Sequence, residues 1–172
     1  MPAELDRFRT VRSHTEELAA PLSPEDQVVQ SMPDCSPTKW HRAHTTWFFE
    51  EFVLSRWGAP YEPVDPRFRY LFNSYYEAVG PRQPRPRRGM ISRPSVEEIA
   101  AYRQAVDDRV AELLADADDP DLLATVELGC HHEQQHQELL LMDAKHLLWQ
   151  NPYRPAYAER EGTGAHPTPQ PA

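Results

Sequence analysis

The sequence is poor in cysteine and glycine and has no long hydrophobic run. Its two cysteines, Cys35 and Cys130, show no CxxC spacing and imply no disulfide framework. No apolar run approaches the roughly 18 residues of a membrane span. The first residues carry no basic segment followed by an apolar one, so no secretory signal is expected. These absences predict a cytoplasmic protein with no membrane partner.

Positive charge is also scarce, because 18 Lys and Arg stand against 27 Asp and Glu, for a formal net charge of -9. Nonspecific binding to nucleic acid needs a basic face, so no nucleic-acid partner is expected. The 172 residues, 40% of them hydrophobic, suffice for one domain with a proper core and are too few for two comfortable ones.

Proline, in contrast, is abundant, and its distribution predicts helices joined by stiff loops. Most of the 18 prolines lie in four clusters, at 60–66, 81–94, 152–155 and 167–171. Four long stretches outside these clusters carry apolar residues at helical spacing: 3–20, 37–57, 95–114 and 120–149. No segment of convincing length alternates with the period of a strand. The sequence therefore predicts an all-α fold, a four-helix bundle with a long crossover loop between the second and third main helices.

Capping residues mark where the predicted helices begin and end. The expected signals are Ser36-Pro37 at the start of the second helix and Gly58 at its end, Ser95 with Glu98 as a capping box, and Asp119-Pro120 before the last helix. The aromatic segment 67–79 of the crossover predicts a helical turn or two. We expect one folded domain over 1–157, followed by a polar, disordered tail over 158–172.

The most unusual segment is HHEQQHQ at 131–137, a run of polar residues inside the otherwise apolar last helix. His132 and His136 are one helical turn apart, so both imidazoles can point at a single ion. A third ligand should come from the second helix, which offers His41 and His44. Three neutral imidazoles leave coordination positions open, as in a catalytic metal site. Imidazole suits Zn, Fe, Ni and Cu alike, so this donor set leaves the metal open.

The same segment contains the motif HExxH at 132–136, in which Glu133 would be the general base of a zinc protease. Those enzymes take their third ligand from further down the chain. Here the next histidine after His136 is His146, on the same helix, and the region has no Gly-x-x-His. No strand is predicted that could hold a peptide substrate. The context therefore argues against a zinc hydrolase.

With both histidine helices in view, the chain resembles the ergothioneine-biosynthesis sulfoxide synthases, the hercynine oxygenases. Several motifs match in order, over about residues 1–157. The matching segments are 36–50 (SPTKWHRAHTTWFFE), 72–81 (FNSYYEAVGP), 92–95 (SRPS), 131–143 (HHEQQHQELLLMD) and 151–157 (NPYRPAY).

This resemblance implies a DinB-like four-helix bundle that holds a non-haem Fe(II) through His44, His132 and His136, with His41 outside the ligand set. The family uses O2 to join a cysteine-type thiol, often γ-glutamylcysteine, to C2 of the imidazole of hercynine, forming a C–S bond and a sulfoxide. A Gln between the two helix histidines lines the hercynine pocket in the family, and that position is Gln135 here.

Arginines before the third helix grip the carboxylates of the thiol substrate in the family, a task for which a guanidinium fork is well shaped. The candidates in this chain are Arg85, Arg87 and Arg88, and the alternative interpretation of these residues is a solvated run of charge.

The chain also departs from the family, whose members continue into a second domain that resembles formylglycine-generating enzymes. That C-terminal domain is expected to be absent here, so the bundle could bind iron without completing the reaction. Its protein partner would then be a separate C-terminal domain or a second copy in a homodimer. Two alternatives stay open: a stand-alone DinB-like thiol transferase that uses zinc, and a non-catalytic metal-binding bundle.

Overall fold

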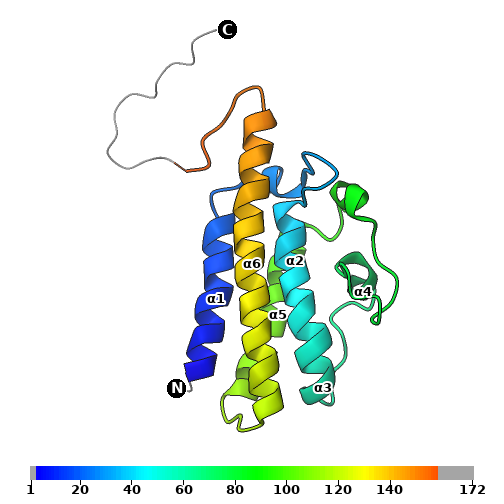
Figure 1. The fold of residues 1–172 in the computed structure, drawn as a ribbon, viewed down its shortest axis with the longest axis vertical. Helices are drawn as coiled ribbons and strands as arrows, with labels where there is room; N and C mark the ends of the chain where they lie inside the picture. The colour runs from blue at the N-terminus through cyan, green and yellow to red at the C-terminus, as the bar shows by residue number, and fades with distance from the viewer. Residues whose placement is uncertain (1–2, 159–172) are drawn as a thin grey trace.

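Four long helices form the bundle that the apolar spacing predicts (Figure 1). They are α1 (Ala3–Ala19), α2 (Thr38–Phe49), α5 (Val96–Leu114) and α6 (Pro120–Gln150). The shorter elements are η1 (Asp26–Val28), the π-helical turn η2 (Glu50–Leu54), α3 (Ser55–Trp57), α4 (Phe68–Leu71) and η3 (Arg85–Met90).

This computed structural model describes residues 3–158, and within that range it contains no strand. The expected all-α class is confirmed. The tail for which we predict disorder lies outside the described residues from position 159 on. None of the helices between residues 3 and 158 combines the length and the apolar character that crossing a membrane requires.

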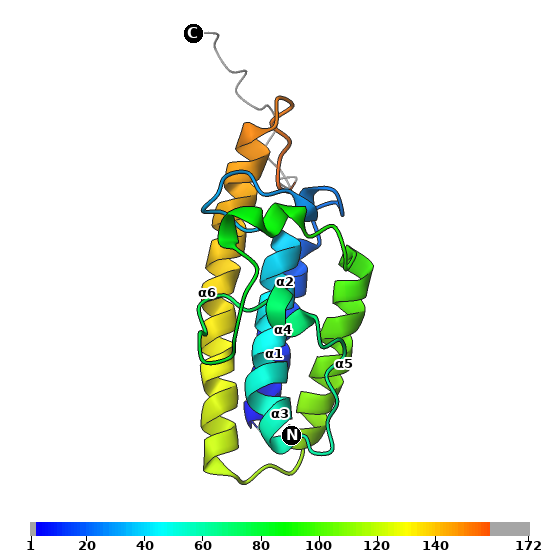
Figure 2. The same ribbon diagram turned by 90° about the vertical axis from the view of Figure 1, so that its right-hand side faces the viewer.

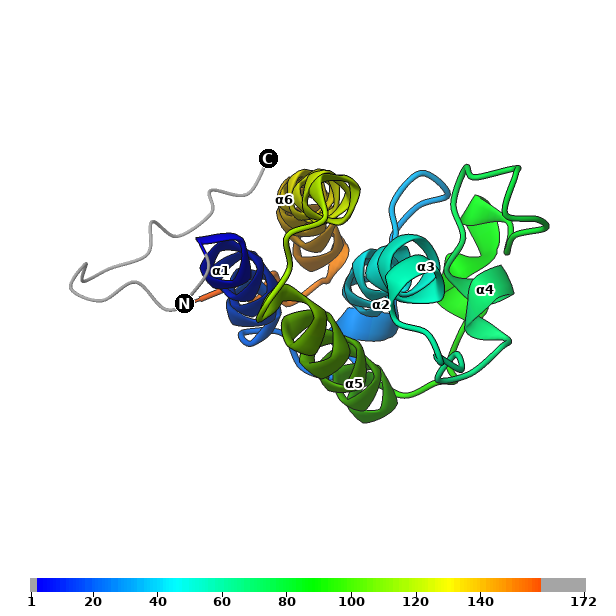
Figure 3. The same cartoon turned by 90° about the horizontal axis from the view of Figure 1, so that it is seen from below.

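The direction of the helices explains the long crossover. In Figures 1 and 2, α1 and α6 run upward while α2 and α5 run downward. Helix α6 packs against α1 and α2, and α5 packs against the same two helices on the other side (Figure 3). Because α2 and α5 are parallel, the chain between them must return along the bundle. It does so on the outer side of α2, with α4 and η3 in its path.

A glycine sets the distance between the two histidine-bearing helices. A Cβ atom added to Gly129 of α6 would lie 2.6 Å from the ring of Phe49 and 3.0 Å from that of Phe48, both on α2. Position 129 therefore needs glycine for close approach. Since His132 follows one turn later, this contact also sets how near the histidines of α6 come to α2.

The predicted second helix reaches Trp57, but it passes through the π-helical turn η2. Its first residue, Glu50, is buried and accepts hydrogen bonds from the hydroxyls of Tyr61 and Tyr102, each at 2.5 Å. Tyr61 belongs to the crossover and Tyr102 to α5. The carboxylate therefore joins three separate parts of the chain at the lower end of the bundle.

One of the predicted caps is wrong. The capping box is confirmed, since Ser95 Oγ accepts from the Glu98 amide and the Glu98 carboxylate accepts from the Ser95 amide. At the start of α2, however, Pro37 occupies the N-cap position and no side chain caps the helix. The Ser36 hydroxyl instead accepts a hydrogen bond from Arg88 at 2.9 Å. The crossover packs against Ser36, and Arg88 of the crossover binds the hydroxyl oxygen that was expected to cap the helix.

Candidate metal centre

Three histidines from two helices converge on one point between α2 and α6. A ring nitrogen of each of His44, His132 and His136 lies within 4.8 Å of the others. The Nε2 atoms of His44 and His132 are 3.2 Å apart, and the ring centroid of His136 lies 4.7 Å from those of both other rings. No other cluster of His, Cys, Asp or Glu with this ligand geometry occurs among residues 3–158. The three side chains could therefore hold a metal ion.

His44 is held in one orientation by its surroundings. Its Nδ1 lies 2.6 Å from the carbonyl oxygen of Phe72 in the crossover. Because a carbonyl oxygen only accepts, Nδ1 carries the proton and Nε2 presents its lone pair to the other two rings. The rings of Trp40 and Trp47 stack on the imidazole, with centroids at 4.6 and 5.5 Å.

The two histidines of α6 differ in the surroundings of their Nδ1 atoms. That of His132 is buried and has no hydrogen-bond partner, and the ring of Phe48 lies beside this imidazole. That of His136 lies 2.9 Å from Nδ1 of His41. His41, the other candidate on the second helix, thus stands behind His136 and does not belong to the convergent group.

Burial keeps these imidazoles in the form that binds metals. It lowers the pKa of His44 well below its ordinary value, and the neighbouring His132 adds to the effect. It lowers the pKa of His132 to about 4. It also lowers that of His136, beside His44 and His41. At neutral pH all three rings are uncharged, as coordination requires. Converging neutral imidazoles fit a late first-row divalent metal.

A cavity of about 260 Å³ opens onto this centre. Besides the three histidines its walls contain two arginines, one carboxylate and several hydroxyl groups. The lining residues are Ser36, Trp40, His41, His44, Ser74, Tyr75, Tyr76, Arg85, Arg88, His132, His136, Leu139 and Asp143. The candidate ligands are therefore accessible from a pocket that also contains charged side chains.

The arginines proposed from the resemblance fall into two groups. Arg85 and Arg88 line the cavity, whereas Arg87 is exposed and does not reach it. Arg85 donates to the hydroxyl of Tyr75 at 2.7 Å. Spacing in the sequence did not separate these three positions, since all belong to one short 3-10 helix, η3, whose successive side chains point in different directions.

Arg88 is the more deeply buried of the two. Its guanidinium lies 3.4 Å from the ring centroid of Trp40 and donates to the hydroxyls of Ser36 and Ser74. Burial lowers the Arg88 pKa to about 10, which still leaves the group charged at neutral pH. Its Nε atom is buried and unpaired. This cation is a suitable partner for an anionic ligand.

Gln135 lies beside this cavity and not in it. The side chain is exposed and lines a second cavity of about 330 Å³, which shares His132 and Tyr76 with the first. Two separate spaces therefore border His132, one lined by arginines and one by Gln135.

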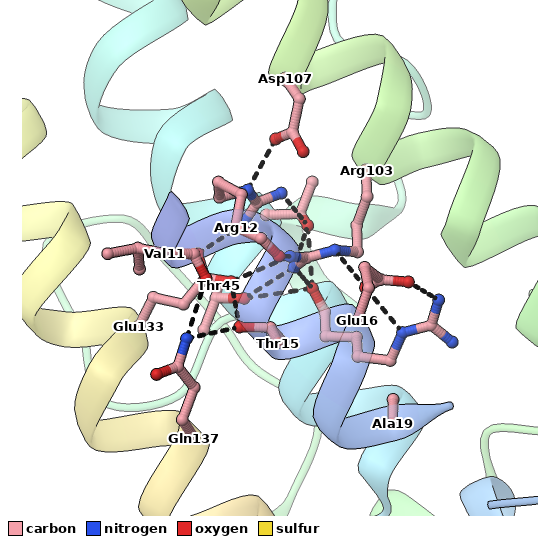
Figure 4. A network of polar contacts seen from close by, with 12 residues as sticks. Val11, Arg12, Thr15, Glu16, Ala19, Thr45, Arg103, Asp107, Glu133 and Gln137 are labelled. Carbon is pink, nitrogen blue, oxygen red and sulfur yellow. Dashed lines mark hydrogen bonds and ion pairs between the residues drawn. The ribbon is translucent and has the colours of Figure 1, made fainter. Parts of the chain in front are cut away.

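Glu133, the base of the HExxH interpretation, lies in a network of polar contacts with residues of α1 and α5 (Figure 4). It is fully buried and accepts hydrogen bonds from Arg12, Arg103 and Thr15 at 2.7, 2.9 and 2.6 Å. Both carboxylate oxygens are thus occupied, so this group cannot serve as a free base at the cavity. The sequence analysis did not identify Arg12 or Arg103. The only sign of their role in the sequence is that each is a charged residue within the apolar stripe of its helix.

The fold and the site define a helical bundle with a candidate three-histidine metal centre. The family profile of the DinB superfamily matches residues 7–147, which contain the three histidines and nearly all of the bundle. The chain belongs to the DinB superfamily. No curated protein sequence matches the chain.

Proposed function

We propose that this chain is the metal-binding domain of an O2-dependent sulfoxide synthase that joins a cysteine-type thiol to hercynine. The observation that carries the proposal is the convergence of His44, His132 and His136 beside two cavities. One cavity is lined by arginines and the other by Gln135, and His132 borders both. The resemblance of the histidine helices to the hercynine oxygenases supplies the reaction. A DinB-type bundle is consistent with it.

In this proposal Fe(II) is held by His44, His132 and His136, and when bound it supplies the redox chemistry with O2. The protein itself binds and orients the two organic substrates. Arg85 and Arg88 would hold the carboxylates of the thiol substrate, because both line the cavity and Arg88 has an unpaired buried Nε–H. Hercynine would occupy the neighbouring cavity at Gln135. His132 borders both spaces, so the two substrates would meet at the centre.

A zinc-dependent thiol transferase is the second candidate. The three histidines suit zinc as well as they suit iron. Three neutral imidazoles with open positions suit Zn as well as Fe(II), and a zinc-bound thiol needs neither O2 nor hercynine. The same arginines would then hold the anionic end of the thiol. A bundle that binds metal without catalysis remains the third interpretation.

Metal content and O2 consumption separate these candidates. Protein purified without oxygen and supplied with Fe(II) should consume O2 only when γ-glutamylcysteine and hercynine are both present, with the sulfoxide detected by mass spectrometry. A separately produced C-terminal domain is added in a parallel reaction, because the bundle alone could lack part of the pocket. Tightly held zinc, with thiol transfer and no O2 consumption, would contradict the proposal.

A matched pair of arginine variants tests the substrate site. Arg85→Gln should weaken the binding of γ-glutamylcysteine to the Co(II)-loaded protein, followed by the change in the visible spectrum. Arg87→Gln removes an equal charge from an exposed side chain that does not line the cavity, and it should leave that binding unchanged. Equal effects of the two changes would indicate a general effect of charge and no specific contact.

A further inference from the structure

The three candidate ligands differ in what holds the ring nitrogen that faces away from the centre. For His44 the partner is the backbone carbonyl of Phe72. For His132 there is none. For His136 the partner is another imidazole, that of His41. A histidine that binds a metal generally has its other ring nitrogen fixed by a hydrogen bond, so the unusual partner of His136 needs an explanation.

His41 is itself held by a carboxylate. Its Nε2 lies 3.0 Å from Oδ2 of Asp143, and both side chains are almost fully buried, with 3% and 6% of their surface exposed. The same oxygen accepts the backbone N–H of Ser36 at 2.8 Å. Asp143, His41 and His136 therefore form a continuous row of side chains that crosses from α6 to α2 and back.

The hydrogen-bonding capacity of these groups determines where the protons lie. Oδ2 of Asp143 accepts the backbone N–H of Ser36 and lies within hydrogen-bonding distance of Nε2 of His41, which donates to it. Nε2 of His41 then carries the proton, and the neutral form of this ring has its lone pair on Nδ1. In that form, Nδ1 of His136 is the donor in the contact between the two rings.

We propose that Asp143 and His41 form a relay that positions His136, fixing its proton on Nδ1 so that the Nε2 lone pair faces the metal centre. This inference rests on the proposed three-histidine site and not on the reaction. Without an acceptor at Nδ1 the ring of His136 could carry its proton on Nε2, which would block coordination. His41 and Asp143 are thus positioning residues, and neither touches the centre.

The relay also joins the same two helices that supply the ligands. His41 precedes His44 by about one turn of α2, and Asp143 follows His136 by two turns of α6. The row of hydrogen bonds therefore depends on the relative position of these two helices. The arrangement is therefore suited to keep His136 aimed at the metal centre.

The test combines the tautomer of His136 with metal affinity. In the metal-free native protein, long-range 1H–15N NMR correlations should show the proton of His136 on Nδ1. His41→Phe keeps a ring but removes the acceptor, so the proton should move to Nε2 or exchange between both nitrogens. The affinity for Co(II), the probe, should fall about 10- to 100-fold, the effect usual for loss of a hydrogen-bonded partner of a metal ligand.

Two conservative variants separate positioning from packing. His41→Asn can place a carbonyl oxygen near the former Nδ1 position and should restore part of the Nδ1 proton signal and of the Co(II) affinity. It also serves as the test if His41→Phe does not fold. Asp143→Asn keeps an acceptor oxygen and loses the charge, so a smaller effect is expected. His131→Phe, at an exposed position on the same helix, is the control and should change neither readout.

A native His136 that carries its proton on Nε2 would overturn the relay, as would an unchanged Co(II) affinity in His41→Phe. These results are distinguishable from a failure of the proposed function. If the native protein bound no Co(II) at all, the metal site would be wrong, and the relay would be overturned with it whatever the tautomer. If it binds Co(II) and shows no sulfoxide formation, only the reaction is contradicted.

Discussion

Residues 131–137 of α6 have two faces that look alike in the sequence and differ in the structure. His132 and His136 face α2 and the cavity. Glu133 and Gln137 face the other helices of the bundle and lie in a dense network of polar contacts (Figure 4). The same short polar run therefore supplies both the candidate site and part of the scaffold behind it.

The two faces differ in how completely their hydrogen bonds are satisfied. On the scaffold face, Glu133 has three donors and Gln137 donates to the Val11 carbonyl and to Thr15. On the cavity face, His132 Nδ1 and Asp143 Oδ1 have no partner. A buried polar group with all its partners stabilises the fold, whereas an unpaired one contributes less to stability.

The largest effect should come from breaking the scaffold face. Glu133→Ala leaves the buried guanidinium groups of Arg12 and Arg103 without this carboxylate, and removing one partner of a buried ion pair costs about 3–5 kcal/mol. Denaturant unfolding measures the loss. Glu138→Ala, an exposed change on the same helix, should stay within about 0.5 kcal/mol. A stable Glu133→Ala protein that binds no metal would instead assign Glu133 to the site.

Removing a candidate ligand from the cavity face should strongly reduce metal affinity and change stability less. His132→Ala should lower Co(II) affinity by more than the roughly 100-fold upper range for a partner of a ligand, since it removes a ligand itself. The free energy of unfolding of the metal-free protein should change less than in Glu133→Ala, because His132 Nδ1 forms no hydrogen bond. Isothermal titration and denaturant unfolding measure the two quantities. His131→Ala is the control, and equal Co(II) affinities of both variants would exclude His132 as a ligand.

Gly129 connects the two faces, because its contact with Phe49 sets the distance between α2 and α6. Gly129→Ala should destabilise the fold by about 1–3 kcal/mol through overpacking, and should also weaken Co(II) binding by moving His132 and His136 away from His44. Phe49→Leu in the same chain removes the ring edge and should recover part of both losses. If Gly129→Ala were as stable as the native protein, the close approach of the helices would be wrong.

The smallest expected effect lies at the edge of the scaffold network, at Glu16, which accepts hydrogen bonds from Arg42 and forms an ion pair with Arg103. Burial alone would raise the pKa of Glu16, but these arginines lower it below the ordinary value near 4.5. Its stabilising contribution is therefore present above about pH 4.5 and is lost as the pH falls through the lowered pKa.

Glu16→Gln tests this pH dependence. Because 41% of the Glu16 side chain is exposed, solvent screens the ion pair, and the variant should lose less than about 1 kcal/mol at pH 7. The difference from the native protein should shrink as the pH falls below 4.5. Thermal unfolding at pH 7 and at pH 3.5 measures it, and a difference that grows toward acid would contradict the assigned sign.

The helices and most of their ends could be predicted, because capping and apolar spacing act over three or four residues. The capping box of Ser95 and the start of α6 after Asp119 are confirmed. The cap at Ser36 is wrong because its hydroxyl is bound to Arg88, a residue of the crossover that no local pattern could place there.

The candidate site was predictable only in part. The spacing of His132 and His136 placed both on one face of a helix, and the structure brings His44 to them. Spacing alone could not choose between His41 and His44, and that choice came from the resemblance. The hydrogen bond of His41 to Asp143 joins two helices that are far apart in the chain, so spacing could not predict it.

The sequence by itself determined the helical segments, the long crossover and the placement of His132 and His136 one helical turn apart. All of these follow from the 3.6-residue period and from hydrogen bonds between near neighbours. Only the tertiary structure decided which residues of HHEQQHQ line the candidate site and which belong to the scaffold. The reason is that the deciding partner of Glu133, Arg12, is 121 positions away in the chain, and only the packing of α1 against α6 brings the two together.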